Sequence, residues 1–406
     1  MLSSITTILA FSAALAQAIP SEEEAQEHRA FGSPRFSLPA VHNPHFVRNG
    51  TASLLKAYRK YGLTPAGNLP PAAANALSKR QDSDTTASPG DGGLEYLIPV
   101  KVGGQLVNLD LDTGSADLWV FSSDLPEDQR QGHNYFDPSK SSTYKPLQGY
   151  SWNIGYQDGS GATGVVGTDT VVVGDTTVHN QAVELATQVS SEFLSDSSDG
   201  LIGLAFSSVN TVQPKQQKTF FENAQSSLES PLFAAYLPFN STGAYDFGYT
   251  DSSKYHGRIT YTAVDTSNGL WEYPSTSYKV GSRTFQAPGA TAISDTGTTL
   301  LLMINDAVIN YYNHVQGAYY DDNALGYVFP CNSYLPPLHV AIGPTAYATI
   351  PSSVLSFEEV GYGYCFGSLQ SVGNGTQSIF GDIFFNANYA VFSADGPKFG
   401  FAPYKS

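Results

Sequence analysis

Residues 110–120 read Asp110-Leu111-Asp112-Thr113-Gly114-Ser115-Ala116-Asp117-Leu118-Trp119-Val120. The Asp-Thr-Gly within this run returns 183 residues later as Asp295-Thr296-Gly297-Thr298. An apolar strand pattern precedes each copy, and an apolar-apolar-Gly element follows each copy at a similar distance: Leu201-Ile202-Gly203 and Ile379-Phe380-Gly381. Two halves with the same ordered markers predict duplicated lobes around a pseudo-two-fold axis, with a ligand cleft between them.

One Asp-Thr-Gly alone is only a turn signal, because Asp and Gly both favour tight turns. Two copies, each at the end of an apolar strand, can bring the carboxylates of Asp112 and Asp295 together on the axis. Glycine lets the two backbones approach closely. The threonine hydroxyls can form hydrogen bonds to the opposite loop, and the hydroxyl of the residue after each Asp-Thr-Gly can donate to an outer carboxylate oxygen. The residues expected in these supporting roles are Gly114 and Gly297, Thr113 and Thr296, and Ser115 and Thr298.

The composition of the 406 residues favours an all-β protein of two domains. Charged residues make up only 14% of the chain, and short apolar runs of period two alternate with Gly, Asp, Asn and Ser. The predicted strands include Tyr96–Val102, Gln105–Leu111, Thr170–Val173 and Tyr389–Phe392. Helical patterns are few, and they cover Lys218–Ala224 and Asn305–Val315.

The first residues have the features of a targeting segment. Leu2 to Leu15 are small or apolar, and Ala16-Gln17-Ala18 matches a signal-peptidase site, so we expect secretion. No later run is long enough to span a bilayer, and no membrane anchor is expected. In an oxidising compartment Cys331 and Cys365 would form a disulfide; two free buried thiols are the alternative.

Charge divides the chain at the dibasic pair Lys79-Arg80. Residues 19–80 carry eight Lys or Arg and four Asp or Glu, whereas the remainder carries 12 basic and 32 acidic residues, or 12 − 32 = −20. A basic segment ahead of an acidic body predicts a pro-segment that docks electrostatically and is cleaved near this pair. The negative charge argues against nucleic acid as a partner and favours tolerance of acid.

The run at residues 110–120 resembles the first active-site motif of the pepsin family, and it is most similar to the secreted fungal penicillopepsin and aspergillopepsin type. The likeness extends from about Leu94 to the C-terminus. It implies a bilobal, pepsin-like all-β fold and a monomeric aspartic endopeptidase that acts on peptides and proteins at acidic pH without a cofactor or metal. The implied segments are a signal peptide (1–18), a propeptide (19–80), a flexible mature N-terminus (81–93), an N-terminal lobe (94–270) and a C-terminal lobe (271–406).

The same resemblance implies roles for residues outside the repeated motif. Residues 152–160 look like the flap that closes over substrate, and Asp158 would favour Lys beside the scissile bond. Lys60-Tyr61 resembles the pair whose ammonium group blocks the two carboxylates in zymogens. Gln157, where the family usually has Gly, and Ser393, where many members have Asp, depart from the pattern. The expected substrate-binding residues are Tyr156, Gln157, Asp158, Gly159, Trp119 and Thr299, with the Tyr156 hydroxyl bonded to the Trp119 indole.

Other interpretations of the sequence are weaker. A glycoside hydrolase would also use two carboxylates, and a binding protein could retain the bilobal fold, but the duplicated Asp-Thr-Gly and the flap tyrosine favour the peptidase. The glycine pattern at 159–164 fits a dinucleotide-binding motif but is not followed by a helix. Glycosylation sequons begin at Asn240 and Asn374, and a third begins at Asn49 in the pro-segment.

Overall fold

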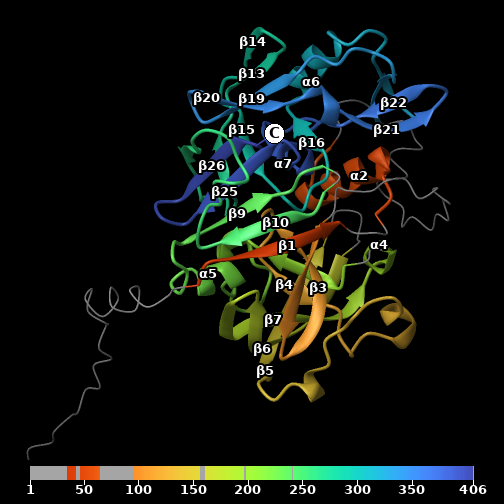
Figure 1. Ribbon diagram of the computed structural model, residues 1–406. Coiled ribbons are helices and arrows are strands. Elements are labelled where there is room, and N and C mark those ends of the chain that lie inside the picture. The colour runs from red at the N-terminus through yellow and green to blue at the C-terminus, as the bar shows by residue number, and fades with distance from the viewer. Residues whose placement is uncertain are drawn as a thin grey trace, which may run out of the picture. The chain divides into compact units, whose positions relative to one another are not determined.

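The computed structural model describes residues 34–42, 46–64, 96–155, 161–195, 198–239 and 241–405. Strands dominate these residues and form four sheets (Figure 1). The largest has, in spatial order, β11 (Thr260–Ala263), β26 (Lys398–Pro403), β25 (Asn388–Ser393), β9 (Leu232–Tyr236), β10 (Gly243–Phe247), β1 (Phe36–His42), β2 (Tyr96–Val102), β3 (Gln105–Asp112), β8 (Gly200–Gly203), β4 (Leu118–Val120), β7 (Thr176–Val189), β6 (Gly161–Val173) and β5 (Lys145–Gly155).

The smaller sheets belong to the second half of the chain. They are β12 (Glu272–Pro274), β15 (Thr291–Ser294), β24 (Gln377–Phe380), β16 (Leu301–Met303) and β23 (Leu369–Ser371); β14 (Arg283–Gln286), β13 (Ser277–Val280), β19 (Leu338–Ile342) and β20 (Ala346–Ile350); and β17 (Tyr319–Asp321), β18 (Gly326–Pro330), β22 (Tyr364–Gly367) and β21 (Ser356–Gly361). The helices of the described residues are α2 (Gly50–Tyr61), α4 (Ser191–Ser195), α5 (Phe220–Ala224), α6 (Asn305–Tyr312) and α7 (Asp382–Phe385), with short 3-10 turns η1 (Glu127–Arg130), η2 (Pro138–Lys140), η3 (Ser207–Val209) and η4 (Ser352–Val354).

The two halves of the chain repeat one pattern of strand pairing. In the first half β3 runs parallel to β8, β8 antiparallel to β4, and β4 parallel to β7. In the second half β15 runs parallel to β24, β24 antiparallel to β16, and β16 parallel to β23. The duplication predicted from the sequence markers is therefore confirmed, and each repeat carries its Asp-Thr-Gly where its first strand ends.

The glycine of each apolar-apolar-Gly element is required by close backbone contact. A Cβ atom on Gly203 would lie 2.6 Å from the Cα of Ala116. A Cβ on Gly381 would lie 2.1 Å from the main-chain oxygen of Thr298. Because only glycine permits such an approach, each element packs directly beneath the loop that bears the Asp-Thr-Gly of its own half.

Part of the predicted pro-segment (residues 19–80) is built into the large sheet. Strand β1 lies between β10 and β2, antiparallel to both, and Figure 1 shows it alongside β10. Its alternate residues Phe36, Leu38 and Ala40 are buried in the main core. Helix α2 follows; the Asn49 side chain caps its N-terminus by accepting from the Ala52 amide at 2.9 Å, and Gly62 ends it in the left-handed conformation.

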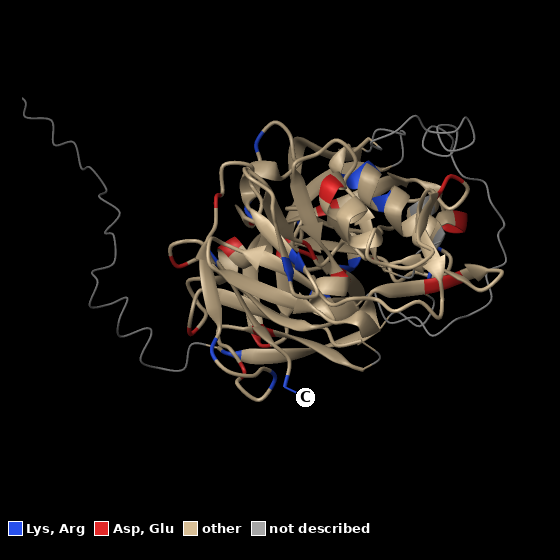
Figure 2. Ribbon diagram, turned by 90° about the horizontal axis from the view of Figure 1, so that it is seen from above, with Lys and Arg blue, Asp and Glu red and all other residues tan. Residues whose placement is uncertain are grey.

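Most predicted elements are confirmed at nearly the predicted bounds. Strand β2 has the predicted limits, and the other three predicted strands lie within or end one residue from β3, β6 and β25. The second predicted helix ends at Tyr312 rather than Val315, because turns that lead to Gly317, at φ 76°, follow it. Acidic and basic residues are interspersed over the described chain (Figure 2).

Candidate active site

Two loops bring their side chains to one point. Each loop donates a hydrogen bond to the other through the hydroxyl group of its threonine. The Thr113 hydroxyl donates to the Ser294 carbonyl at 2.9 Å, and the Thr296 hydroxyl donates to the Leu111 carbonyl at 2.6 Å. Each hydroxyl also accepts the opposite threonine amide, at 3.0 Å for Thr113 and 3.2 Å for Thr296. All four bonds are buried, so they fix the relative position of the loops.

The carboxyl groups of Asp112 and Asp295 meet between these loops. Both residues are buried, with 2% and 0% of their surface exposed. The Gly114 amide donates to Asp112 Oδ1 at 2.8 Å, and the Gly297 amide donates to Asp295 Oδ1 at 3.0 Å. A Cβ on Gly114 would lie 2.5 Å from Asp295 Oδ1, and a Cβ on Gly297 would lie 2.4 Å from Asp112 Oδ1. Each glycine therefore lies against the opposite carboxyl group, and no larger residue fits there.

The hydroxyl that follows each Asp-Thr-Gly behaves differently in the two loops. Thr298 donates its hydroxyl to Asp295 Oδ2, in the expected role. Ser115 does not make the expected bond, because its buried hydroxyl has no hydrogen-bond partner among the described residues. Asp112 Oδ1 is instead contacted by the Gly114 amide and by an ammonium group from the predicted pro-segment.

That ammonium group belongs to Lys60, near the end of α2. Its Nζ lies 2.7 Å from Asp112 Oδ1 and 2.9 Å from Asp295 Oδ2, with 11% of the lysine side chain exposed. The Tyr61 hydroxyl donates to Asp295 Oδ2 at 2.7 Å. The structure thus brings together the two carboxyl groups and the Lys-Tyr pair that the sequence singled out.

Burial and charge shift the pKa values at this site in opposite directions. Burial raises the pKa of Asp112 to about 6. The charge of Lys60 acts to lower this pKa, and the charge of Asp295 acts to raise it. Burial also acts to raise the pKa of Asp295, but Lys60 and the hydrogen bonds to this carboxyl group lower it below its usual range. Burial disfavours the Lys60 ammonium, yet the two aspartates outweigh it and raise the pKa of Lys60. The pair therefore ionises unequally.

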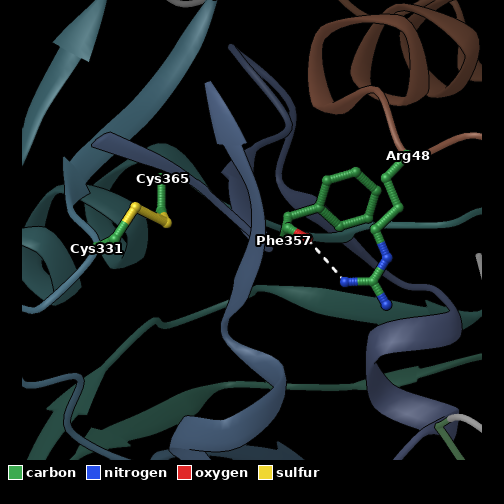
Figure 3. The surroundings of a disulfide bond; sticks show 4 residues. All are labelled: Arg48, Cys331, Phe357 and Cys365. Carbon is green, nitrogen blue, oxygen red and sulfur yellow. Dashed lines mark hydrogen bonds between the residues drawn. A yellow bond between two sulfur atoms is a disulfide. The ribbon is translucent and has the colours of Figure 1, made fainter. Parts of the chain in front are cut away.

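The predicted pro-segment makes further contacts that the sequence did not reveal. Arg48 donates to the Phe357 carbonyl at 2.8 Å, on the strand that pairs with the one carrying Cys365 (Figure 3). The Gly50 amide donates to the Glu358 carboxylate at 2.5 Å, and the Tyr58 hydroxyl donates to the Ser371 carbonyl at 2.8 Å. The alternation of β1 and the Asn49 and Gly62 caps of α2 were visible signals for these elements, but the pattern gave no indication of where they dock.

The remaining predicted site residues have mixed outcomes. Trp119 is buried against Trp152 and Phe193, at ring-centroid distances of 5.8 and 5.0 Å, and its indole Nε1 has no partner among the described residues. Thr299 is half-buried, and its carbonyl accepts the Ile383 amide at 3.3 Å. Outside the described residues lie Tyr156, Gln157, Asp158 and Gly159, together with Asn240, the signal-like segment and Lys79-Arg80.

Three further features concern stability and surroundings. Cys331 and Cys365 form a disulfide (Figure 3). Asn374 is exposed, and its main-chain amide donates to the Thr64 carbonyl at 3.3 Å, where the described part of the predicted pro-segment ends. Within the described residues, no cluster of His, Cys, Asp and Glu could hold a metal ion, and no helix is long and apolar enough to cross a membrane.

A sequence model of the family described as "Eukaryotic aspartyl protease" matches residues 95–404. The chain belongs to this family. Aspergillopepsin-1 of Aspergillus pseudoglaucus is 46% identical over 398 residues, which cover 98% of this chain and 98% of the relative. Penicillopepsin-1 of Penicillium janthinellum is 51% identical over 311 residues, or 76% of this chain and 95% of the relative. The resemblance to the pepsin family is confirmed, and the protein is an aspartic endopeptidase with a pepsin-like, mainly β fold.

Proposed function

We propose that this aspartic endopeptidase is secreted as an inactive zymogen and hydrolyses peptide bonds at acidic pH with Asp112 and Asp295. The observation that carries the proposal is the meeting of these two buried carboxyl groups between loops that bond to each other through Thr113 and Thr296. Two carboxyl groups in contact cannot both ionise at low cost, so they share one proton once Lys60 has left.

The shared proton gives the two carboxyl groups different roles. The ionised group acts as general base on a water molecule between them, and the protonated group donates to the carbonyl oxygen of the scissile peptide. Water oxygen bonds to the carbonyl carbon, and its proton passes to the carboxylate. The tetrahedral intermediate then collapses; its C–N bond breaks, and the nitrogen leaves as an amine after taking a proton from the pair. Which residue begins protonated in the mature enzyme is a property of the coupled pair.

Lys60 supports the inactive state of the proposed zymogen. Its ammonium group contacts oxygens of both carboxyl groups, where the water molecule would have to bind. The Lys60 charge lowers the pKa of both aspartates. By linkage, protonation of the aspartates weakens the docking of Lys60, so falling pH favours release of the pro-segment.

The location and specificity follow from other features. The apolar segment before residue 19 and the disulfide support passage through an oxidising secretory compartment. Trp119 and Phe193, which lie beyond the Asp112 loop, support a preference for bulky apolar residues. Acceptance of Lys at the same position is proposed from Asp158 by resemblance.

The proposal is tested by secreting the full chain from a eukaryotic host and acidifying it. We expect no hydrolysis of denatured protein near neutral pH, hydrolysis after acidification, and a new N-terminus close to residue 81. Hydrolysis by the uncleaved chain at neutral pH would contradict the zymogen, and release of reducing sugar instead of peptides would contradict the reaction.

A further inference from the structure

A second pair of carboxyl groups lies directly behind the Asp112 loop, which comprises residues 112–116. Asp117 follows this loop, and Glu184 lies on β7 in register with Trp119 of the neighbouring strand β4. Asp117 and Glu184 are 2% and 1% exposed. The side-chain amide of Asn210 joins them, because its Nδ2 lies 2.8 Å from Asp117 Oδ1 and 3.0 Å from Glu184 Oε1.

Hydrogen-bond donors are distributed unequally over this pair. Thr211 donates to Asp117 Oδ1 through its amide at 2.8 Å and its hydroxyl at 3.1 Å. Glu184 Oε2 is also buried, and it makes no hydrogen bond of good geometry to a donor among the described residues. An ionised carboxylate oxygen without a donor is costly in such a place. A proton on Oε2 would convert it from an unsatisfied acceptor into a donor.

The electrostatic surroundings also favour a proton here. No Lys, Arg or His of the described chain forms an ion pair with Asp117 or Glu184, so each faces mainly the other charge. Burial, and then the charge and the hydrogen bond of Asp117, raise the pKa of Glu184 well above its usual range, although hydrogen bonds from Asn210 and the Leu118 amide oppose the shift. Burial also raises the pKa of Asp117, although hydrogen bonds from Thr211 oppose it.

We propose that Asp117 and Glu184 hold one proton between them at acidic pH, and that this proton ties strand β7 to the Asp112 loop. Glu184 Oε2 carries the proton and donates it to the Asp117 carboxylate, while Asn210 bridges the other oxygens. The protein would then have two proton-sharing carboxyl pairs, one at the surface of the site and one supporting it from behind.

Main-chain contacts connect the second pair to the first. The Gly203 amide donates to the Asp117 carbonyl at 2.7 Å, and the next amide, of Leu204, donates to the Asp112 carbonyl at 2.7 Å. The Asn210 side chain also donates to the Ala116 carbonyl at 3.1 Å. If the shared proton is lost, two like charges remain in a buried place, and separating them requires movement of β7 or of the Asp112 loop.

The direction of the pH effect follows from linkage. Because the pKa of Glu184 is raised in the folded chain, the folded state holds a proton that the unfolded state releases. This group therefore stabilises the fold most strongly below its unfolded pKa, and its contribution is lost as the pH rises toward and through the folded pKa.

The test substitutes Glu184→Gln in the full chain, because the glutamine amide donates to Asp117 at every pH. The tryptophans include Trp119 and Trp152, which lie near the pair, so their fluorescence reports urea unfolding. In the unsubstituted chain we expect the urea concentration at the unfolding midpoint to decrease as the pH rises from about 5 to about 8. In Glu184→Gln this decrease should be at least about twofold smaller.

Glu222→Gln is the matched control. It removes one negative charge from α5, where the Glu222 carboxylate accepts the Ser207 amide at 2.9 Å, and it should show the same fall as the unsubstituted chain. An equal fall in Glu184→Gln would overturn the proposal. All three chains keep Asp112 and Asp295 and are compared at each pH, so the difference between them, and not peptide cleavage, decides the result.

Infrared spectroscopy provides a second measurement that does not depend on stability. The protonated-carboxyl band of the unsubstituted chain above pH 6 should exceed that of Glu184→Gln by one carboxyl group, because the Asp112–Asp295 pair contributes equally to both spectra. If the two bands are equal, the shared proton does not exist and the proposal is wrong. The absence of any such band from the unsubstituted chain would show the same, even if the variant fails to fold.

Discussion

At the scale of residues, Asp112 and Asp295 can come into contact because the residues beside them have no side chain. Gly114 and Gly297 each lie against the opposite carboxyl group, and each donates its amide to its own. These glycines could be predicted from the duplicated motif. The buried Asp117–Glu184 pair could not, nor could the Ser115 hydroxyl, which has no partner among the described residues. Burial and the supply of hydrogen-bond donors depend on segments distant in the sequence.

Gly114→Ala should disable the enzyme with little effect on its stability. The added Cβ would lie 2.5 Å from Asp295 Oδ1, so the carboxyl group must shift and the shared proton is misplaced. A displacement of this kind costs on the order of 100-fold in kcat. Kinetics on a peptide at acidic pH, together with thermal melting, check it. Gly375→Ala is the control, because its nearest neighbour lies 3.5 Å away, and equal kcat values for the two variants would refute the explanation.

At the scale of elements, the period-two runs predicted β2 and β3 well. Buried and more exposed residues alternate along β2, whereas β3 is buried on both faces from Leu109 to Asp112. The same alternation is present in β1, and cap residues flank α2, yet neither element was predicted. Short elements of this kind are stabilised by the surface on which they dock. That surface includes β10 and the strands around Phe366, which no local pattern identifies.

Gly50→Ala should weaken the docking of α2 without touching the aspartates. The new Cβ would lie 2.2 Å from the Phe366 ring, although alanine by itself favours a helix. We therefore expect the substituted zymogen to convert faster at a given acidic pH, as followed by gel electrophoresis. Ala52→Ser changes an exposed position of the same helix and should convert at the normal rate. Slower conversion of Gly50→Ala would show that the Phe366 contact does not hold the segment.

At the scale of the whole molecule, the repeat of strand pairing places one aspartate loop in each half, and Lys60 of the basic segment 19–80 contacts both aspartates. The division into a basic segment and an acidic body was visible in the sequence as eight basic residues against four acidic ones, followed by a net −20. The duplication was equally visible, because the same sequence markers occur twice in the same order.

Lys60→Met should move activation to higher pH. Removing the ammonium group leaves the pro-segment without its ion pairs, and the pKa values of both aspartates rise because Lys60 lowers them. The midpoint of conversion against pH should rise by about one unit or more. Lys56→Met removes the same charge from an exposed position of α2 and should leave the midpoint in place. An unchanged midpoint in Lys60→Met would mean that another contact controls release.

The most direct measurement of the central claim is kcat/KM for Asp112→Asn, Asp295→Asn and the double variant, after the pro-segment is removed by an added protease. Two residues that share one proton act as a unit, so each single variant should lose at least about a thousandfold and the double variant should lose little more. Substantial hydrolysis by the double variant, or losses that multiply as for independent residues, would contradict the assignment of these two aspartates.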